Sequence, residues 1–297
     1  MKRTYATPLA FKDAVERRLR DEAFSKGREV NRLRQLLVFD RFLARAFKLD
    51  GGLVLKGGLA LDLRVENARA TRDVDLRAVG EPDGFLGTLQ EAGRLNLNDF
   101  LRFDVQLDRE APTIEGDGVV YGGRRYRAQG MLAGRAYGAP FGVDVVFGGP
   151  VTGSIEVVEG KPFLRFADID PAMLRILPVE QHIAEKLHAL SLPRPGPNSR
   201  MRDLPDVLVL AGLRPIEAKL LTSAIRSTFD YRDTHPWTGD VPPLPATWAA
   251  PYSSVAAVLG LRWRTLDDAV AAARAFIQPL ATGQPERWNP AAWGWDP

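Results

Sequence analysis

Apolar residues recur every three to four positions through most of the first fifty residues. The pattern is clearest from Phe11 to about Phe24 and from Asn31 to Phe47. This spacing places the apolar side chains on one face of a helix and the polar side chains on the other. The sequence therefore predicts two amphipathic helices ahead of the first strand.

Short apolar or alternating runs, separated by glycine and polar residues, follow up to about residue 168 and are typical of strands. The run GGLVLKGG predicts a short buried strand, and two segments, Gly58–Arg64 and 83–94, are predicted helices. The further predicted strands are Thr71–Arg77, Leu101–Leu107, Val119–Met131, Phe141–Phe147 and a pair near residues 154–168. The expected fold class is α/β (α+β) with a mixed or antiparallel sheet.

Helical spacing returns beyond residue 170, where we place a boundary between two domains. The predicted helices are Val179–Leu192, Leu204–Leu213, Pro215–Thr228 and Leu266–Ile277. All six tryptophans follow residue 236, in a proline-rich connection and a tail that we expect to pack on these helices. The expected organisation is a sheet-containing domain over residues 1–170, with its helical preface, and a mainly helical domain over residues 171–297.

The composition excludes several classes of protein. Apolar residues make up 45% and charged residues 26% of the chain, as in soluble globular proteins. The absence of cysteine excludes disulfides and thiolate metal sites, and three scattered histidines are too few for a histidine-rich zinc centre. A bound metal would need oxygen ligands, which favours magnesium or manganese. Because no apolar run is long enough for secretion or membrane spanning, we expect a cytoplasmic protein with no membrane contact.

The charge is small but unevenly distributed. A net charge of +3 does not by itself indicate nucleic-acid binding. Residues 118–137, however, hold four arginines and three tyrosines and no acid. Arg124, Arg125 and Arg127 are candidate RNA contacts, since arginines pair with phosphates and tyrosines stack on bases. An exposed hairpin with solubilising charge explains the same residues equally well.

A glycine pair follows the first predicted strand. At a strand-to-helix turn, Gly57 and Gly58 let backbone amides approach an anion closely, and the helix N-terminus favours negative charge. The pair is therefore a candidate cradle for a triphosphate. A tight turn that needs a positive φ angle is the alternative explanation.

Asp73 and Asp75 share one face of the next predicted strand with Thr71, because strand side chains alternate. Carboxylates on one face can hold divalent cations that stabilise the attacking and leaving oxygens of a phosphoryl or nucleotidyl transfer. The competing interpretation is that both acids simply face water.

Asp144 lies in the otherwise apolar strand FGVDVVFGG, where an unpaired carboxylate is costly. A cation must meet it, either as part of a metal site with Asp73 and Asp75 or in a salt bridge to an arginine such as Arg135. The metal alternative, with the glycine pair, gives the residue set of the polymerase β-type nucleotidyltransferases.

The helical half adds a lysine and two acids. The helix VEQHIAEKLHALS places His182 and Lys186 on one face, and Lys186 is a candidate phosphate ligand or a solvated surface lysine. In SRMRDLPDVLVL, Asp203 is the predicted N-cap, with Pro205 in the first turn and Asp206 at the third helical position. These helix-start roles explain both acids and are compatible with a catalytic role for Asp206.

Four blocks in order resemble the AbiEii/AbiGii-type nucleotidyltransferase toxins of type IV toxin–antitoxin and phage-defence systems, which include the mycobacterial MenT enzymes. The blocks are K-G-G-x-A-L-x-L-R with T-x-D-x-D-L (Lys56–Arg64 and Thr71–Leu76), the aspartate of V-D-V-V-F, E-K-L-H-A-L (Glu185–Leu190) and R-x-R-D-x-x-D (Arg200–Asp206). The resemblance spans about residues 30–280, and the ordered set is more specific than any single block.

The resemblance implies a role for each matching residue. It implies metal ligation by Asp73, Asp75 and Asp144, which are catalytic together with Lys186 and Asp206. It implies nucleotide contacts by Gly57, Gly58, Thr71, Lys186, Arg200, Arg202 and Asp203. Two positions depart from the family pattern, since Leu59 replaces a small hydroxyl residue and Arg202 a frequent lysine. Arginine does not donate a proton at neutral pH, so position 202 retains only an electrostatic role.

The expected function is a nucleotidyltransferase toxin that uses Mg²⁺ or Mn²⁺ and moves NMP from an NTP to an acceptor hydroxyl. The resemblance implies tRNA 3′ ends as acceptors, with a block of translation, and a winged-helix antitoxin as partner. One alternative is nucleotide transfer to a small molecule or a protein hydroxyl. Another is a nucleotide-binding module that acts by interaction without turnover.

Overall fold

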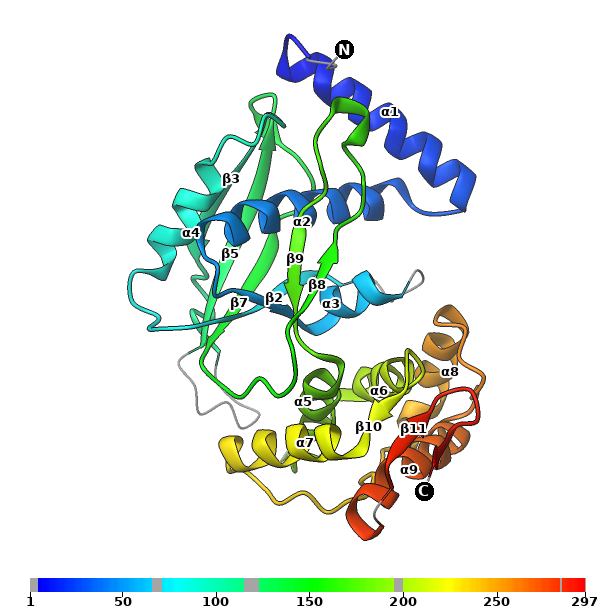
Figure 1. Ribbon diagram of the computed structural model, residues 1–297. Helices are drawn as coiled ribbons and strands as arrows, with labels where there is room; N and C mark the ends of the chain where they lie inside the picture. The colour runs from blue at the N-terminus through cyan, green and yellow to red at the C-terminus, as the bar shows by residue number, and fades with distance from the viewer. Residues whose placement is uncertain (1–4, 66–70, 115–122, 195–199, 284, 297) are drawn as a thin grey trace.

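The computed structural model describes residues 5–65, 71–114, 123–194, 200–283 and 285–296. These residues form one half built on a mixed sheet and a second, mainly helical half (Figure 1). Each half has its own hydrophobic cluster, the first running from Phe11 to Ile176 and the second from Val179 to Trp288 with Leu61 added. The predicted fold class, a mixed α/β sheet followed by helices, is confirmed.

The large sheet has the strand order β3-β5-β7-β2-β1-β9-β8, and β4 and β6 pair with β5 outside this order. The pairs β2–β7 and β1–β9 are parallel, and the others are antiparallel. Side chains alternate between buried and half-buried positions along β7, as its sequence predicts. The strands are β1 Val54–Lys56, β2 Asp73–Ala78, β3 Leu101–Leu107, β4 Thr113–Ile114, β5 Gly123–Leu132, β6 Arg135–Ala136, β7 Phe141–Phe147, β8 Glu156–Glu159 and β9 Met173–Ile176.

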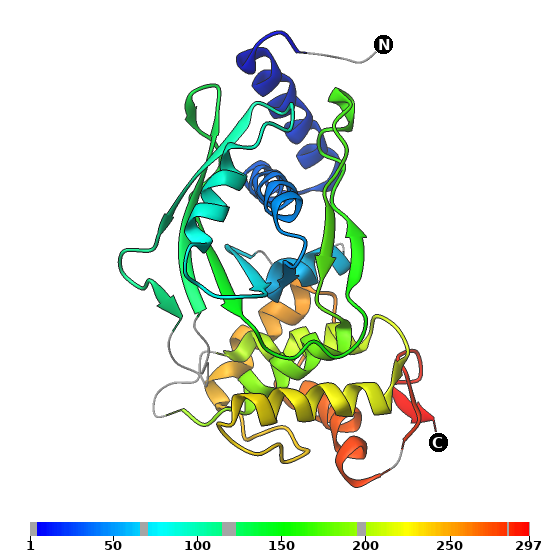
Figure 2. The ribbon, with the colours of Figure 1, turned by 60° about the vertical axis from the view of Figure 1, so that its left-hand side comes forward.

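The sheet curves around helix α2, which lies between the β3 side and the β9 side (Figure 2). Both predicted N-terminal helices form, and α1 begins where Thr7 accepts a hydrogen bond from the amide of Ala10 and Pro8 takes the first helical position. The helices of this half are α1 Pro8–Lys26, α2 Val30–Leu49, α3 Gly57–Arg64 and α4 Phe85–Arg94.

Within its described residues, the helical half contains the four predicted helices and one that no clear periodicity indicated, α8. Its helices are α5 Val179–Ser191, α6 Asp203–Ala211, α7 Ala218–Arg232, α8 Ala249–Val258 and α9 Leu266–Thr282. A small antiparallel sheet joins them, with β10 Ile216–Glu217, β11 Arg287–Asn289 and β12 Gly294–Asp296. In the described part of the chain, no helix has both the length and the apolar character needed to cross a bilayer.

The tryptophan-rich tail packs on the helices, as predicted. The indole N–H of Trp288 donates to the carbonyl of Ala211 in α6 at 2.8 Å, and Trp288 is fully buried. The indoles of Trp293 and Trp295 donate to carbonyls of α9 at 3.0 and 2.9 Å. The tail therefore satisfies its polar groups while it covers the second hydrophobic cluster.

The strand pair predicted near residues 154–168 is only half correct. Its first strand is β8, but residues 165–167 form a 3₁₀ turn and the second strand, β9, comes later. The apolar residues near the turn misled the prediction, because Leu164 is buried in the first cluster from a loop. Since β9 ends at Ile176, the large sheet continues past residue 170, and the division into domains at that point stays a prediction.

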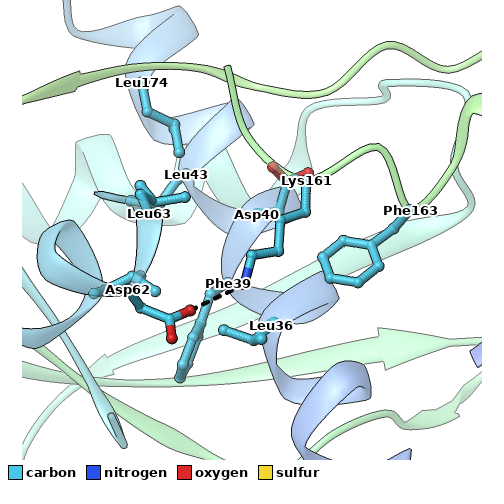
Figure 3. Close-up of a pocket in the computed structure, with 10 residues that line it drawn as sticks. Leu36, Phe39, Asp40, Leu43, Asp62, Leu63, Lys161, Phe163 and Leu174 are labelled. Atoms are coloured by element: carbon cyan, nitrogen blue, oxygen red, sulfur yellow. Dashed lines mark hydrogen bonds and ion pairs between the residues drawn. The ribbon is translucent and has the colours of Figure 1, made fainter. Parts of the chain in front are cut away.

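Ion pairs of Asp62 hold helix α3 to helix α2 and to the loop after β8. Its carboxylate, 1% exposed, meets Arg32 at 2.8 Å and Lys161 at 3.2 Å. The Lys161–Asp62 pair borders a cavity of about 20 Å³ between α2, α3 and the loop that carries Lys161 (Figure 3). These pairs fix the helix whose N-terminus begins at the glycine pair.

Candidate active site

Four charged side chains form a row across four neighbouring strands, β1, β2, β7 and β5. Lys56 is the register partner of Asp75, Asp75 of Asp144, and Asp144 of Arg125. Register partners in a sheet share one face. Along that face the order of the side chains is therefore a cation (Lys56), two acids (Asp75 and Asp144) and a second cation (Arg125). The structure thus brings together the predicted residues Asp75 and Asp144, and Asp73 lies two residues from Asp75 on the same face.

Two glycines leave the room that the acids occupy. Gly57 has φ +65°, and a Cβ atom at this position would collide with the carboxylate of Asp75. A Cβ atom at Gly142 in β7 would come within 2.7 Å of Asp73 Oδ1. Gly57 was a sequence candidate for the site, whereas Gly142 was not. The sequence signal for Gly142 is a glycine inside an apolar strand, which often marks a close approach.

The acids of the row repel one another. Burial, and next to it the Asp144 carboxylate, raise the pKa of Asp75 to about 6. The same two causes raise the pKa of Asp73. Added positive charge between these carboxylates would relieve this repulsion.

Asp144 already has a cationic partner, and it is Arg125. The guanidinium donates from Nε to Oδ1 and from Nη2 to Oδ2, both at 2.7 Å. The hydrogen bond to Asp144 raises the pKa of Arg125 above its already high value. The salt-bridge alternative therefore holds, but Arg135 was the wrong partner, since it lies exposed in β6 while the β5–β7 register sets Arg125 opposite Asp144.

The donor set suits a hard divalent cation, although the cluster is not arranged as a metal site. Among the described residues, no three carboxylate or histidine side chains are placed to hold a metal ion as they stand. Arg125 engages both oxygens of Asp144. Asp73, Asp75 and Asp144 are nevertheless oxygen donors on one face, which fits Mg²⁺ or Mn²⁺ once Asp144 is released.

Lys186 projects from α5 and lies between two acids of α6. Its ammonium meets Asp203 Oδ1 at 2.7 Å and Asp206 Oδ2 at 2.8 Å. Although burial acts to lower it, the two carboxylates raise the pKa of Lys186. An ammonium has three N–H donors, and the described residues engage two of them, which leaves the third for a ligand in the cavity.

The prediction that Asp203 caps α6 is wrong. The helix begins at Asp203 itself, after a 3₁₀ turn over Arg200–Arg202, and none of the side chains that the structure describes caps it. Asp206 consequently lies one position later in the helix than predicted. The ammonium of Lys186 draws both carboxylates away from the helix end.

An ion pair between Lys56 and Glu185 joins the two halves of the molecule beside the row. Lys56 Nζ in β1 meets Glu185 Oε2 in α5 at 2.7 Å, and Arg232 of α7 lies 3.9 Å from the same oxygen. Burial acts to raise the pKa of Glu185, but Lys56 and Arg232 outweigh it and lower the pKa to about 2. Both Lys56 and Glu185 lie within the sequence blocks quoted above, yet neither was assigned a role.

These residues line a cavity of about 1040 Å³ between the sheet and the helical half. The sequence candidates that line it are Gly57, Gly58, Thr71, Asp73, Asp75, Asp144, Lys186, Arg200, Arg202, Asp203 and Arg125. Asp206 is buried next to it and acts on it through Lys186.

Several lining residues had not been assigned to the site from the sequence, among them Arg32, Arg72, His182 and, from α8, Ser254, Val255 and Val258. They come from α2, α5, α8 and the segment before β2, which only tertiary packing brings together.

Because side chains alternate along β5, the arginines of this segment lie on opposite faces of the sheet. Arg125 and Arg127 share the face of the acids, whereas Arg124 points to the opposite face. The expectation that its tyrosines stack on bases is wrong for Tyr126 and Tyr137, which are buried in the core. Tyr121 lies outside the described residues.

The sequence model of a family described as "Nucleotidyl transferase AbiEii toxin, Type IV TA system" matches residues 41–286. This match bears out the family resemblance seen in the sequence blocks. No curated protein sequence matches the chain.

Solved structures with the same fold include MenT4, a nucleotidyltransferase toxin from Mycobacterium tuberculosis H37Rv. It is 18% identical, with a TM-score of 0.57 over 94% of this chain and 92% of that one. JHP933 from Helicobacter pylori is 18% identical, with a TM-score of 0.39 over 67% and 77% of the two chains. A putative nucleotidyltransferase from H. pylori is 16% identical, with a TM-score of 0.45 over 82% and 92%.

Proposed function

This chain belongs to the AbiEii family of nucleotidyltransferase toxins of type IV toxin–antitoxin systems, and from this premise we propose that it transfers NMP from an NTP to the 3′ end of tRNA. The reaction depends on a divalent cation, Mg²⁺ or Mn²⁺, and it stops translation by blocking aminoacylation. The protein acts in the cytoplasm, where a cognate antitoxin, which we expect to be of the winged-helix type, counteracts it.

One observation carries the proposal. The parallel pairing of β2 and β7 sets Asp75 beside Asp144, with Asp73 on the same face, in the wall of a cavity of about 1040 Å³. Three acids at one place are costly for stability, and nucleotidyl transfer is a reaction that uses them. A cavity of this size has room for a nucleotide and the end of an acceptor strand.

The transfer exchanges a phosphoanhydride bond for a phosphate ester bond. The acceptor hydroxyl oxygen forms a bond to the α-phosphorus, and the bond from this phosphorus to the β-phosphate oxygen breaks, so that pyrophosphate leaves. The hydroxyl proton passes to a carboxylate of the row and then to water. Asp73, Asp75 and Asp144 would hold a divalent cation, which would supply positive charge to compensate the phosphate charge.

The protein's own groups orient the nucleotide. Gly57 and Gly58 present backbone amides at the start of α3, where phosphate oxygens are favoured. The third N–H of Lys186 donates to a phosphate oxygen, while Asp203 and Asp206 keep the ammonium in place. Arg200 and Arg202 add positive charge at the same wall of the cavity.

The proposed RNA contact involves two arginines of β5. Arg127 is exposed on the face of the acids, two residues from Arg125 in β5 and opposite Gly142 of β7. We propose that it and Arg124 meet RNA phosphates from two sides of β5. Replacement of both by glutamine would then weaken RNA binding and reduce its dependence on salt.

A transfer assay tests the function. Purified protein is incubated with Mg²⁺, each radiolabelled NTP in turn and total tRNA, and the RNA is resolved on a gel. The matched variants are Asp75→Asn, in the row, and Asp104→Asn, an exposed acid on β3. Label on tRNA with the wild type and with Asp104→Asn, but not with Asp75→Asn, is the expected result.

Other outcomes redirect or reject the proposal. Label on protein or on a small molecule, and never on RNA, would move the function to another acceptor. Nucleotide binding without label on any acceptor, combined with toxicity that survives Asp75→Asn, would point to a module that acts by interaction.

A further inference from the structure

Arg125 ends the charged row and occupies the whole carboxylate of Asp144. Its two hydrogen bonds, both 2.7 Å long, engage the two oxygens separately. Such a bidentate pair is among the stronger polar contacts in proteins. Asp144 can therefore bind another cation only after at least one of these bonds breaks.

The rest of the protein holds Arg125 loosely. Its side chain is 39% exposed and lines the large cavity, and among the described residues Asp144 is its only hydrogen-bond or ion-pair partner. Arg45 in α2 shows how this protein fixes a structural arginine. That side chain is fully buried and donates to Asp99 and to three backbone carbonyls. Arg125, unlike Arg45, is free to leave its partner toward the cavity.

A divalent cation among the acids would change the electrostatic surroundings of Arg125. Without a cation, Arg125 pairs with Asp144 and is attracted by Asp73 as well, while Lys56 is engaged by Glu185. A divalent cation would offset the negative charge of the acids and add two positive charges beside the guanidinium, so the guanidinium would be repelled. A triphosphate in the cavity attracts the same guanidinium.

Building on the proposed function, we infer that Arg125 is a displaceable counter-ion of the metal site. In the nucleotide-free protein its guanidinium holds Asp144 in place of a metal. When the site loads, Asp144 turns to the divalent cation, and Arg125 swings into the cavity and binds phosphate oxygens of the NTP. Removal of the guanidinium then has two effects of opposite sign, since it strengthens cation binding and weakens nucleotide binding.

The first measurement is Mn²⁺ binding in the absence of nucleotide. The electron paramagnetic resonance signal of the free ion reports how much Mn²⁺ remains unbound. The proteins compared are the wild type, Arg125→Gln, Arg127→Gln and Asp75→Asn. Arg127→Gln removes the same charge from the same face of the same strand. Arg125→Gln is expected to bind Mn²⁺ about threefold to tenfold more tightly than the wild type, the scale of a partly exposed ion pair. Arg127→Gln is expected to match the wild type.

The second measurement is calorimetric binding of the α,β-methylene analogues of the four NTPs at saturating Mn²⁺. The analogue that the wild type binds best is expected to bind Arg125→Gln about tenfold more weakly, since one charged phosphate contact is lost. Arg125→Met is a second variant without hydrogen-bonding groups, and both variants are checked by thermal unfolding.

The inference requires both the tighter binding of Mn²⁺ and the weaker binding of the nucleotide analogue by Arg125→Gln. Unchanged or weaker Mn²⁺ binding by Arg125→Gln and Arg125→Met overturns it, as does unchanged binding of the analogue. If Asp75→Asn loses Mn²⁺ while Arg125→Gln behaves as the wild type, only the inference fails and the proposed metal site stands. If Asp75→Asn binds Mn²⁺ like the wild type, the proposed metal site fails together with the inference.

Discussion

Asp75 on β2 and Asp144 on β7 are register partners in neighbouring parallel strands. Two carboxylates far apart in the chain thus share one face of the sheet, and this proximity, after burial, helps to raise the pKa of Asp75 to about 6. The arrangement disfavours the folded protein at neutral pH. An arrangement of this kind is expected where a substrate or cation uses it.

Replacement of Asp75 should separate activity from stability. Asp75→Asn removes one acid from the row while it keeps the shape of the side chain. Transfer of NMP should fall by about a hundredfold or more, since the loss of one charge-stabilising group commonly costs this much. The melting temperature should stay the same or rise, because a repulsion is removed. A variant that transfers NMP at the wild-type rate would contradict the role of the row.

A methyl group at Gly57 should damage the site directly. In Gly57→Ala the new Cβ collides with the Asp75 carboxylate, and φ +65° is strained for alanine. We expect a loss of about 1–3 kcal/mol in the free energy of unfolding, together with a loss of nucleotide binding. Chemical denaturation and calorimetric NTP titration measure the two effects.

Gly87 offers the matched control for this substitution. It lies exposed in α4, and no atom is near the position of an added Cβ. Gly87→Ala should stabilise the protein by about 0.5–1 kcal/mol and leave nucleotide binding unchanged. If the two variants behave alike, the close approach of Gly57 to Asp75 does not matter for the site.

Local sequence pattern predicted most of the elements, because each buries one regular face. The runs from Phe11 to Phe24 and from Phe141 to Phe147 carry helix and strand periods that nothing interrupts. The pattern failed where burial is irregular, as at Leu164, which reaches the core from a loop. It also gave no signal for α8, whose apolar residues follow no clear helical period.

The sequence indicated the acids of the candidate site but not the side chains that form ion pairs with them. Asp144 stands out because an acid is rare in an apolar strand, and Asp73 and Asp75 stand out because alternate positions of a strand share one face. The partner of Asp144 depends on the register between β5 and β7, which the sequence does not state, so Arg135 was named where Arg125 pairs. In the same way, Asp203 serves Lys186 instead of the helix end because α5 packs against α6.

Lys186 should contribute to stability as well as to substrate binding. Lys186→Met leaves the carboxylates of Asp203 and Asp206 buried without their ammonium. Loss of one partner from a buried ion pair typically costs about 3–5 kcal/mol, so the midpoint of urea denaturation should fall markedly. Transfer activity should be lost in parallel.

A double variant distinguishes the two effects of Lys186. In Lys186→Met/Asp206→Asn one of the two carboxylate charges that lost the ammonium is removed, so a large part of the lost stability should return. Transfer activity should not return, because the phosphate ligand is still missing. Recovery of activity together with stability would show that Lys186 has a purely structural role.

Asp40 in α2 should make stability depend on pH. Burial raises its pKa to about 6, although Arg41 acts to lower it, and Oδ1 has no hydrogen-bond partner within the described residues. The unfolded chain, with an ordinary pKa of 3.8, loses its proton first as the pH rises. The folded state therefore loses stability as the pH rises from about 4 through about 6, by roughly 2–3 kcal/mol. The variant Asp40→Asn tests this dependence, because it lacks the titrating carboxyl group. Its free energy of unfolding should exceed that of the wild type by an amount that grows as the pH rises through this window.

Urea denaturation at a series of pH values measures the difference, with Asp104→Asn as an exposed control. An advantage that shrinks as the pH rises would show that the Asp40 carboxylate is stabilised by the fold.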